Sequence, residues 1–298
     1  MSNTSTIEWT NATWNFLLGC EKVSPGCAGC YAVKDVLRMA GNPNEKVSAA
    51  NRGLAYRQAN GVLNWTGAVR LLPERLAAPF TWPAPKKVFV NSLSDLFHAD
   101  VPLEFIRRAF AVMRATPWHT YQALTKRAER LEALSPELDW PDNLWMGVSV
   151  ESQPYATRVD HLRRTGAKVK FLSVEPLIGP VALDLAGIDW VITGGESGPR
   201  ARPFDPAWAL AVREQCRESG TLFFHKQNGG RNKKLTGRLL GDRTYDEMPP
   251  TTSVEVPTAR VRRELAARLV PEANEAAREA RLVPLTLVEG EVGDDTAE

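Results

Sequence analysis

Cys20-Glu21-Lys22-Val23-Ser24-Pro25-Gly26-Cys27-Ala28-Gly29-Cys30-Tyr31 is the stretch around which the rest of the chain is organised. It holds three of the four cysteines, in the spacing C-x6-C-x2-C. Three thiolates on one short loop that contains Gly and Pro can converge on one point, which metal binding needs and core packing does not. Pairs spaced Cys-x-x-Cys occur in zinc sites and in iron–sulfur sites. Three ligands leave a fourth coordination position open, and chemistry can occur there.

Two other interpretations of this loop stay open. In the first, the three cysteines are incidental and bind nothing. In the second, a distant side chain completes a structural zinc site. The candidates for that fourth ligand are His98, His225 and Cys216. Cys216 occupies an apolar position in a predicted helix, so we expect it in the core.

The bulk composition is typical of a soluble globular protein. The 298 residues are 43% hydrophobic and 24% charged, which suffices for one large domain or two ordinary ones. No apolar run is long enough to cross a bilayer, and residues 1–10 do not resemble a signal peptide. We therefore expect a cytoplasmic protein without a membrane partner, in which reduced thiols favour metal ligation over disulfides. The net charge of +2 is too small to argue for a nucleic-acid partner by itself.

Short apolar runs alternate with helical patterns along most of the chain. This rhythm predicts a parallel sheet with crossover helices. The expected strands are 14–19, 88–90, 119–124, 144–150, 169–174, 188–193 and 221–224. About seven strands fit an α/β fold, a complete or partial (β/α) TIM-like barrel over residues 1–250 that carries the Cys loop at 20–30. An open doubly wound sheet is the alternative.

Two regions depart from this rhythm. Residues 42–85 are rich in Asn, Gly, Pro and Trp, so we expect an irregular excursion of unassigned role. Residues 251–298 are expected to form an irregular C-terminal extension. Its part at 258–281 has a helical composition, and its acidic end at 289–298 is expected to be disordered.

Nearly every predicted strand ends on a charged or amide side chain. In parallel α/β folds, ligands bind at the carboxyl ends of the strands, so these side chains would share one mouth with the Cys loop. The candidate catalytic residues are Asp95, Lys126, Glu151, Glu175 and Lys226, and Arg127 and Gln227 stand beside them. Each lysine is also a candidate ion-pair partner of a neighbouring glutamate. In Gly194-Gly195-Glu196 the glycines expose the backbone and the carboxylate can hold an ammonium group, although a tight turn would explain them too.

Several of these stretches together resemble a known family. They are Ile7-Glu8-Trp9-Thr10, Gly19–Ala32, Asn91–His98, Leu124–Arg127, Gly147–Glu151, Ser173–Leu177 and Gly194–Gly198. In order, and over residues 6–250, they are similar to a phage and bacterial family of unassigned function that shares a three-cysteine motif. That family in turn resembles the radical S-adenosylmethionine (SAM) enzymes.

This resemblance implies a fold, two cofactors and a mechanism. Radical SAM enzymes use a complete or partial (β/α) barrel in which three cysteines hold a 4Fe-4S cluster, here Cys20, Cys27 and Cys30. Their usual spacing is C-x3-C-x2-C with an aromatic before the last Cys, whereas Tyr31 follows it here. Their Gly-Gly-Glu element follows the second strand, whereas here it follows a late one. The residues implied in cofactor binding are Tyr31, Asn91, Ser92, Ser94, Gly194, Gly195 and Glu196.

The sequence leaves three functional hypotheses. The first is an iron–sulfur, SAM-dependent radical enzyme that takes electrons from a donor such as flavodoxin or ferredoxin. Its substrate is unidentified, and the phage association, slight basicity and Trp content suggest a nucleic acid or a nucleotide. The second is a zinc-stabilised protein that binds or processes nucleic acid. The third is a metal-free barrel hydrolase using Asp95, Glu151, Glu175 and Glu196 as acid and base groups.

Overall fold

Seven parallel strands form the central sheet of the computed structural model, which describes residue 5 and residues 7–273. They are β1 (Ala12–Trp14), β6 (Lys87–Val90), β7 (Thr120–Thr125), β8 (Leu144–Ser149), β9 (Val169–Val174), β10 (Trp190–Gly194) and β11 (Leu222–Gln227). The strands lie side by side in chain order, and each pairs in parallel with the next. An open doubly wound sheet reverses its strand order at a switch point, so that alternative is wrong.

The sheet is a partial barrel and not a closed one. β1 and β11 are its two edges, and they do not pair with each other within the described residues. The first strand also lies earlier than expected. Residues 14–19 were predicted to be one strand, but the chain leaves the sheet after Trp14, and β2 (Leu17–Leu18) pairs antiparallel with β5 (Arg70–Leu71) in a separate ribbon.

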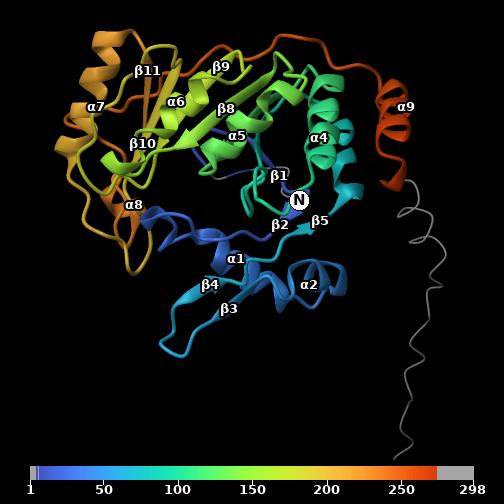
Figure 1. The fold of residues 1–298 in the computed structure, drawn as a ribbon, viewed down its shortest axis with the longest axis horizontal. Coiled ribbons are helices and arrows are strands. Elements are labelled where there is room, and N and C mark those ends of the chain that lie inside the picture. The colour runs from blue at the N-terminus through green and yellow to red at the C-terminus, as the bar shows by residue number, and fades with distance from the viewer. Residues whose placement is uncertain (1–4, 6, 274–298) are drawn as a thin grey trace, which may run out of the picture.

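Helices cover the convex face of the sheet (Figure 1). They are α4 (Leu103–Ala115), α5 (Ala128–Leu134), α6 (Arg158–Arg163) and α7 (Pro206–Ser219). The connection from β9 to β10 has no helix and instead buries Leu177, Val181 and Leu185 under the sheet. α7 begins at the N-cap Asp205 and ends at Gly220 with φ of 71°, and both residue types favour these positions.

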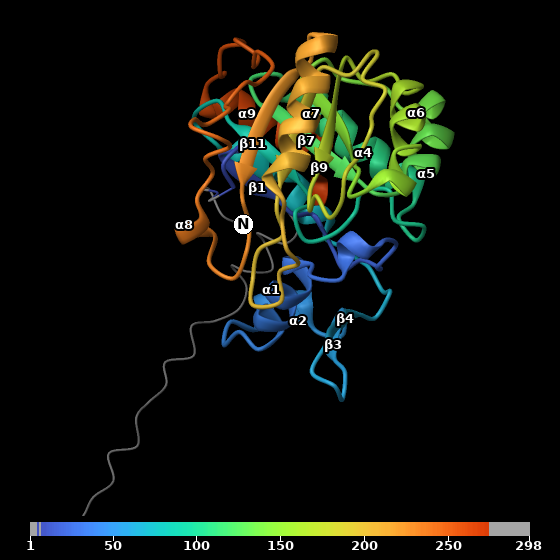
Figure 2. The ribbon, with the colours of Figure 1, turned by 90° about the vertical axis from the view of Figure 1, so that its left-hand side faces the viewer.

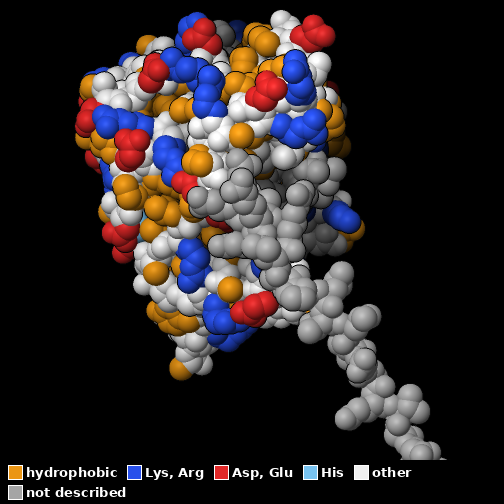
Figure 3. Space-filling view, turned by 90° about the vertical axis from the view of Figure 1, so that its right-hand side faces the viewer, with side chains coloured by type: hydrophobic (Ala, Val, Ile, Leu, Met, Phe, Trp, Pro, Cys, Tyr) orange, Lys and Arg blue, Asp and Glu red, His pale blue; other side chains and the backbone are white. Residues whose placement is uncertain are grey.

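The C-terminal part packs against the helical layer. α9 (Ala259–Leu269) lies beside α4 and α3 (Ala78–Thr81), and Arg262 donates to the carbonyls of Phe80 and Trp82 at 3.0 and 2.8 Å. On this face Lys and Arg side chains are interspersed with Asp and Glu (Figure 3). The rest of the predicted helix at 258–281 and the acidic end at 289–298 lie beyond residue 273, outside the described residues. No helix of residues 7–273 is both long and apolar enough to cross a membrane.

The concave face of the sheet is filled with aromatic side chains, which accounts for several of the tryptophans. This inner cluster consists of Trp9, Phe89, Trp145, Phe171, Trp190, Ile192 and Phe224. A Cβ at Gly147 would lie 2.5 Å from the Phe171 ring, so glycine is needed where that ring crosses β8. This packed cluster fills the inside of the sheet, and two cavities lie at the carboxyl ends of its strands.

Residues 42–72 form an ordered lobe and residues 73–85 pack into the main core, so the expectation of an irregular excursion at 42–85 was wrong. The lobe contains α2 (Glu45–Asn51) and the hairpin of β3 (Ala55–Arg57) and β4 (Leu63–Trp65), which pack against α1 (Tyr31–Ala40). Figures 1 and 2 show these elements set off from the body that carries the sheet. Their own small core holds Leu18, Ala32, Val33, Val36, Ala50, Leu54 and Trp65. Strands of two or three residues carry too little periodicity to be recognised in sequence.

Candidate functional site

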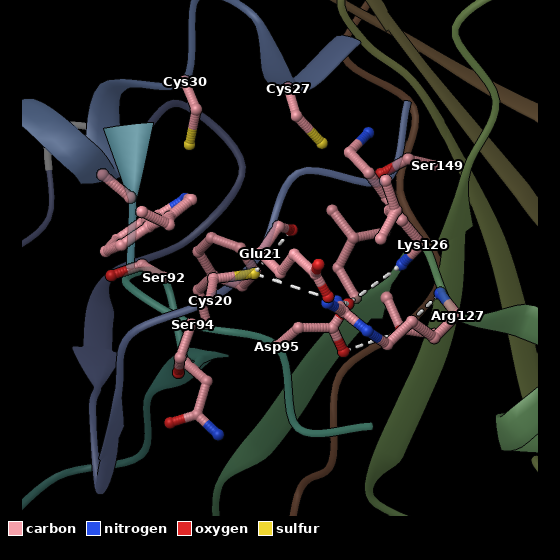
Figure 4. Close-up of a pocket in the computed structure, with 17 residues that line it drawn as sticks. Cys20, Glu21, Cys27, Cys30, Ser92, Ser94, Asp95, Lys126, Arg127 and Ser149 are labelled. Atoms are coloured by element: carbon pink, nitrogen blue, oxygen red, sulfur yellow. Dashed lines mark hydrogen bonds and ion pairs between the residues drawn. The ribbon is translucent and has the colours of Figure 1, made fainter. Parts of the chain in front are cut away.

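The three cysteines of the loop line one pocket of about 600 Å³. Cys20 follows Gly19, whose φ of 90° and close approach to the Ala68 carbonyl exclude a side chain. Cys27 ends a 3-10 turn (Pro25–Cys27), and Cys30 is the N-cap of α1. Figure 4 shows the sulfur atoms of Cys27 and Cys30 on one side of the hollow and that of Cys20 on the other. The fold thus brings together the three thiols that the motif singles out.

The other walls of this cysteine pocket come from two strand ends and the lobe. β6 contributes Asn91 and the residues after it, β7 contributes Lys126 and Arg127, and Trp65 of the hairpin closes the outside. Burial raises the pKa of the Cys20 thiol to about 12, with Asp95 raising it further and Arg127 opposing this. Burial also raises the pKa of Cys30. A metal at these sulfurs would have to displace their protons, as metal binding to thiols generally does.

A second cavity, of about 940 Å³, lies at the mouth of the half-barrel and shares Cys27 and Cys30 with the cysteine pocket. We call it the mouth cavity. The predicted residues that line it are Tyr31, Lys126, Glu175, Gly195, Glu196 and Lys226. Those that line the cysteine pocket are Asn91, Ser92, Ser94, Asp95 and Lys126. Glu151 and Gly194 line neither the cysteine pocket nor the mouth cavity. Both lie against residues that line one of them.

Glu151 is fully buried and braces the cysteine loop against β8. Its Oε1 accepts from Ser24 Oγ at 2.6 Å and from the Lys126 ammonium, and its Oε2 accepts from Arg158 Nη1 at 3.0 Å. A Cβ at Gly26 would lie 2.4 Å from this side chain. Burial disfavours the ionised carboxylate, but Lys126, Ser24 and Arg158 together hold the pKa of Glu151 below its usual range.

Glu196 braces the same loop from the other side. Arg202 holds its carboxylate with three hydrogen bonds of 2.8–3.0 Å. A Cβ at Gly29 would lie 2.4 Å from Glu196 Oε1. Burial opposes ionisation, and the Arg202 hydrogen bonds outweigh it and lower the pKa of Glu196. Gly26 and Gly29, which precede the last two cysteines of the loop, therefore each have a glutamate directly over them.

Glu175 and Lys226 form an ion pair of 3.1 Å on the wall of the mouth cavity. A Cβ at Gly194 would lie 2.6 Å from Glu175 Oε2, and one at Gly195 would lie 2.4 Å from the Asn228 carbonyl. Gly195 is thus required by close packing against the backbone, whereas Gly194 faces the end of the Glu175 side chain, and neither glycine has a positive φ. Gly195 also reaches the cavity, where its backbone faces the space beside Lys226.

Arg127 is a site residue whose role sequence reasoning missed. Its Nη1 donates to Asp95 Oδ2 at 2.9 Å and to the sulfur of Cys20 at 3.8 Å, and its Nη2 is buried without a partner among the described residues. Asp95 also accepts from Phe97 N, Thr125 Oγ1 and the Lys126 N–H. The position of Arg127 after a predicted strand marked it as a candidate in the sequence. Its contact with Cys20 could not be predicted from the sequence pattern.

Asn91 stands at the carboxyl end of β6 in an unusual conformation. It has φ of 56°, the only positive value for a non-glycine among the described residues. Both atoms of its side-chain amide are buried, and neither has a hydrogen-bond partner in the described chain. Such strain and unmet polarity persist at ligand sites, because a bound group supplies the missing partners. Next to it, Tyr31 OH donates to the Ser92 carbonyl at 3.0 Å.

The candidates for a fourth metal ligand lie in other settings. Cys216 is 1% exposed in the outer core, as expected. His225 engages Thr193 and Asn228 through its two ring nitrogens, and His98 is buried with no partner for Nε2 among the described residues. Within the described part of the chain, no three His, Cys, Asp or Glu side chains are grouped as a site for a metal ion. A multi-iron cluster does not need three ligands around a single ion, because each cysteine binds a different iron.

Comparison with known proteins identifies a family. The pattern of the family described as "Protein of unknown function (DUF5131)" matches residues 4–249. Among solved structures, the chain is similar to "Spore photoproduct lyase complexed with dinucleoside spore photoproduct", with 14% identity and a TM-score of 0.40. The similarity covers 71% of this chain and 62% of that one, so the chain spans less than two thirds of that structure. No curated protein matches the sequence.

Proposed function

The chain belongs to the family described as "Protein of unknown function (DUF5131)", and we propose that it is an iron–sulfur enzyme that uses SAM. The observation that carries the proposal is the position of Cys20, Cys27 and Cys30. Three thiols line one pocket at the carboxyl mouth of a parallel half-barrel, and this pocket adjoins a larger cavity. Three thiolates are the donor set that leaves one iron of a 4Fe-4S cluster free for another ligand.

The residues around the pocket fit such a group. The buried amide of Asn91 and the buried Nη2 of Arg127 both lack partners among the described residues, and both belong to residues that line the pocket. Polar ligands such as the amino and carboxylate groups of SAM would supply them. When bound, the cluster and SAM supply the radical chemistry, and the protein supplies binding, orientation and electrostatics.

The chain's own residues then have distinct roles. Asn91, Ser92 and Ser94 at the end of β6 would contact the cofactor in the cysteine pocket. In the mouth cavity, Tyr31 and the Gly195 backbone complete the cofactor side, and Lys126, Glu175 and Lys226 face the substrate. Glu151 and Glu196 hold the cysteine loop in place, and Asp95 holds Arg127 at Cys20. An electron donor such as flavodoxin or ferredoxin would serve as the reducing partner.

The state of the carboxylates argues against the hydrolase hypothesis. Glu151 and Asp95 are each bound by Lys or Arg and by further donors, Glu196 is held by three donors of Arg202, and Glu175 is paired with Lys226. A general acid or base needs a proton to exchange near neutral pH, whereas these partners hold the pKa of Glu151 and of Glu196 below its usual range. The same residues, as supports of the cysteine loop, need no such exchange.

Anaerobic purification and a SAM-cleavage assay test the proposal. We expect a brown protein with iron and sulfide, which releases 5′-deoxyadenosine from SAM on reduction. Cys27→Ala should lose the iron, the colour and the product, whereas Cys216→Ala, in the outer core, should keep all three. A colourless wild type with one equivalent of zinc would contradict the proposal, as would SAM cleavage that persists in Cys27→Ala.

A further inference from the structure

A third cavity, of about 1690 Å³, runs along the open side of the half-barrel. Its walls include β1 at one edge of the sheet and β11 at the other, together with α1 and α2 of the lobe. We call it the edge cleft. It is continuous in its lining with the mouth cavity, because both contain Tyr31, Ser197, Lys226 and Gln227. A ligand in the edge cleft would therefore reach the space beside Cys27 and Cys30.

Two segments that contribute residues to this cleft are rich in Lys and Arg. Residues 21–72, which include the lobe, hold seven Lys and Arg against three Asp and Glu. Residues 226–241, which include α8 (Lys233–Thr236), hold five Lys and Arg and no Asp or Glu. The whole chain carries only +2, so these two segments hold far more than their share. Figure 2 shows α8 at the end of the body that faces the lobe.

Both basic segments contribute cations to the cleft. Arg38 enters from α1, Lys226 from β11 and Lys233 from α8. Arg38 pairs with Asp35 and Lys233 with Glu8, and both carboxylates line the cleft. These two pairs are solvent-accessible, and exposed pairs are weak and readily exchanged. Lys226 is paired with Glu175 of the mouth cavity. A chain of phosphates is the partner that matches a cleft with cations on both sides.

The lining also offers groups that bind bases. Tyr31 is 52% exposed, with its hydroxyl anchored to the Ser92 carbonyl, so the ring is presented rigidly at the junction of the two cavities. Gln227 Oε1 and Asn51 Oδ1 are buried acceptors without partners among the described residues. An exposed aromatic ring between cations is typical of proteins that bind single strands by stacking.

We propose that the edge cleft binds a single-stranded nucleic acid, with its phosphates on the two basic flanks and one base against Tyr31. This names a substrate class and rests on the proposed function for the chemistry that follows, whereas the binding itself needs no cluster. An acidic protein could bind the same positive charge, but it would be expected to dock on a flat surface. The cations here line a hollow that leads to the cysteines, which suits a strand that can enter it.

Fluorescence anisotropy with labelled DNA and RNA strands of about 12 nucleotides tests the proposal. The full-length protein is titrated at several salt concentrations, with and without its iron. We expect the logarithm of the association constant to fall linearly with the logarithm of salt. Each phosphate contact in a single strand contributes a slope of about 0.7. The triple variant Arg231→Gln/Lys233→Gln/Lys234→Gln should therefore flatten the slope by about 2.

Two matched controls separate specific binding from general charge. Arg107→Gln/Lys168→Gln/Arg217→Gln removes the same charge elsewhere and should leave the slope unchanged. Tyr31→Ala should weaken binding about 5- to 150-fold through loss of stacking, and Tyr31→Phe should retain most of the affinity.

Three outcomes would overturn the inference: equal effects of the two triple variants, displacement of the strand by polyglutamate at matched charge, or no binding by protein that cleaves SAM. The last result would leave the proposed function intact. Binding through the cleft by protein that never acquires iron would contradict the proposed function alone.

Discussion

Gly26→Ala tests whether Glu151 is the support of the cysteine loop. Gly26 has an ordinary φ, so an alanine backbone fits and only the new Cβ matters. That atom would lie 2.4 Å from both Cγ and Oε1 of Glu151. The glutamate has no free space to move into, since it is 0% exposed and its oxygens are held by Ser24, Lys126 and Arg158.

The size of the destabilisation depends on whether the cysteine loop or the Glu151 side chain moves. If the loop shifts and the carboxylate stays, the cost is that of overpacking, about 1–3 kcal/mol. If the carboxylate leaves its two cations, a buried charged network is broken at about 3–5 kcal/mol. We expect the first, because the loop is the less constrained side. Cys27 follows Gly26 directly, so its thiol moves with the loop, and iron retention should fall together with stability.

Urea unfolding of the apoprotein and an iron titration measure these two effects. Gly179→Ala is the matched control, because its φ is ordinary and no atom lies within 4 Å of the position that the new methyl group would take. In Gly26→Ala/Glu151→Asp the shorter side chain makes room, so the double variant should lose less than the sum of the singles. If Gly26→Ala matches Gly179→Ala within about 0.5 kcal/mol and loads iron normally, Glu151 does not hold the loop.

Three further predictions concern other parts of the chain. Burial lowers the pKa of His119 from 6.5 to about 4, so the unfolded chain takes up the proton first and stability falls as pH drops from about 6.5 to about 4. Between those pH values, His119→Gln should remove up to about 3 kcal/mol of the change in the free energy of unfolding measured with urea. An unchanged pH profile would refute this. Asp205→Ala loses the 2.8 Å N-cap bond to Ala207 N and should cost about 1 kcal/mol by the same assay, with no effect on iron content. Arg127→Gln removes the cation beside Cys20 and should make the reduction potential of the iron–sulfur cluster more negative in a redox titration. Arg127→Lys should shift this potential less. Equal potentials in the wild type and both variants would contradict a role for the Arg127 contact with Cys20.

The alternation of strands and helices was visible in the sequence because both patterns are local. Asp205 and Gly220, at the two ends of α7, are residue types that favour a helix start and a helix end, so these boundaries also follow from local sequence. The lobe of residues 42–72 was missed since its strands are only two or three residues long and since β5 is held by a distant partner, as Leu71 pairs with Leu17. The distinction between a partial and a closed barrel was likewise beyond the sequence, because it depends on whether the two edge strands meet.

The sequence by itself determined the cysteine motif, the glycine before each of its last two cysteines and the polar strand ends. Only the tertiary structure decided what these features face. Ser24 lies 127 residues from Glu151, and Cys20 lies 107 residues from Arg127, yet each pair is in contact. Such pairs are set by the order of strands in the sheet, which local periodicity does not encode. The same folding brings Arg38 of one basic segment and Lys226 and Lys233 of another to the lining of one cleft.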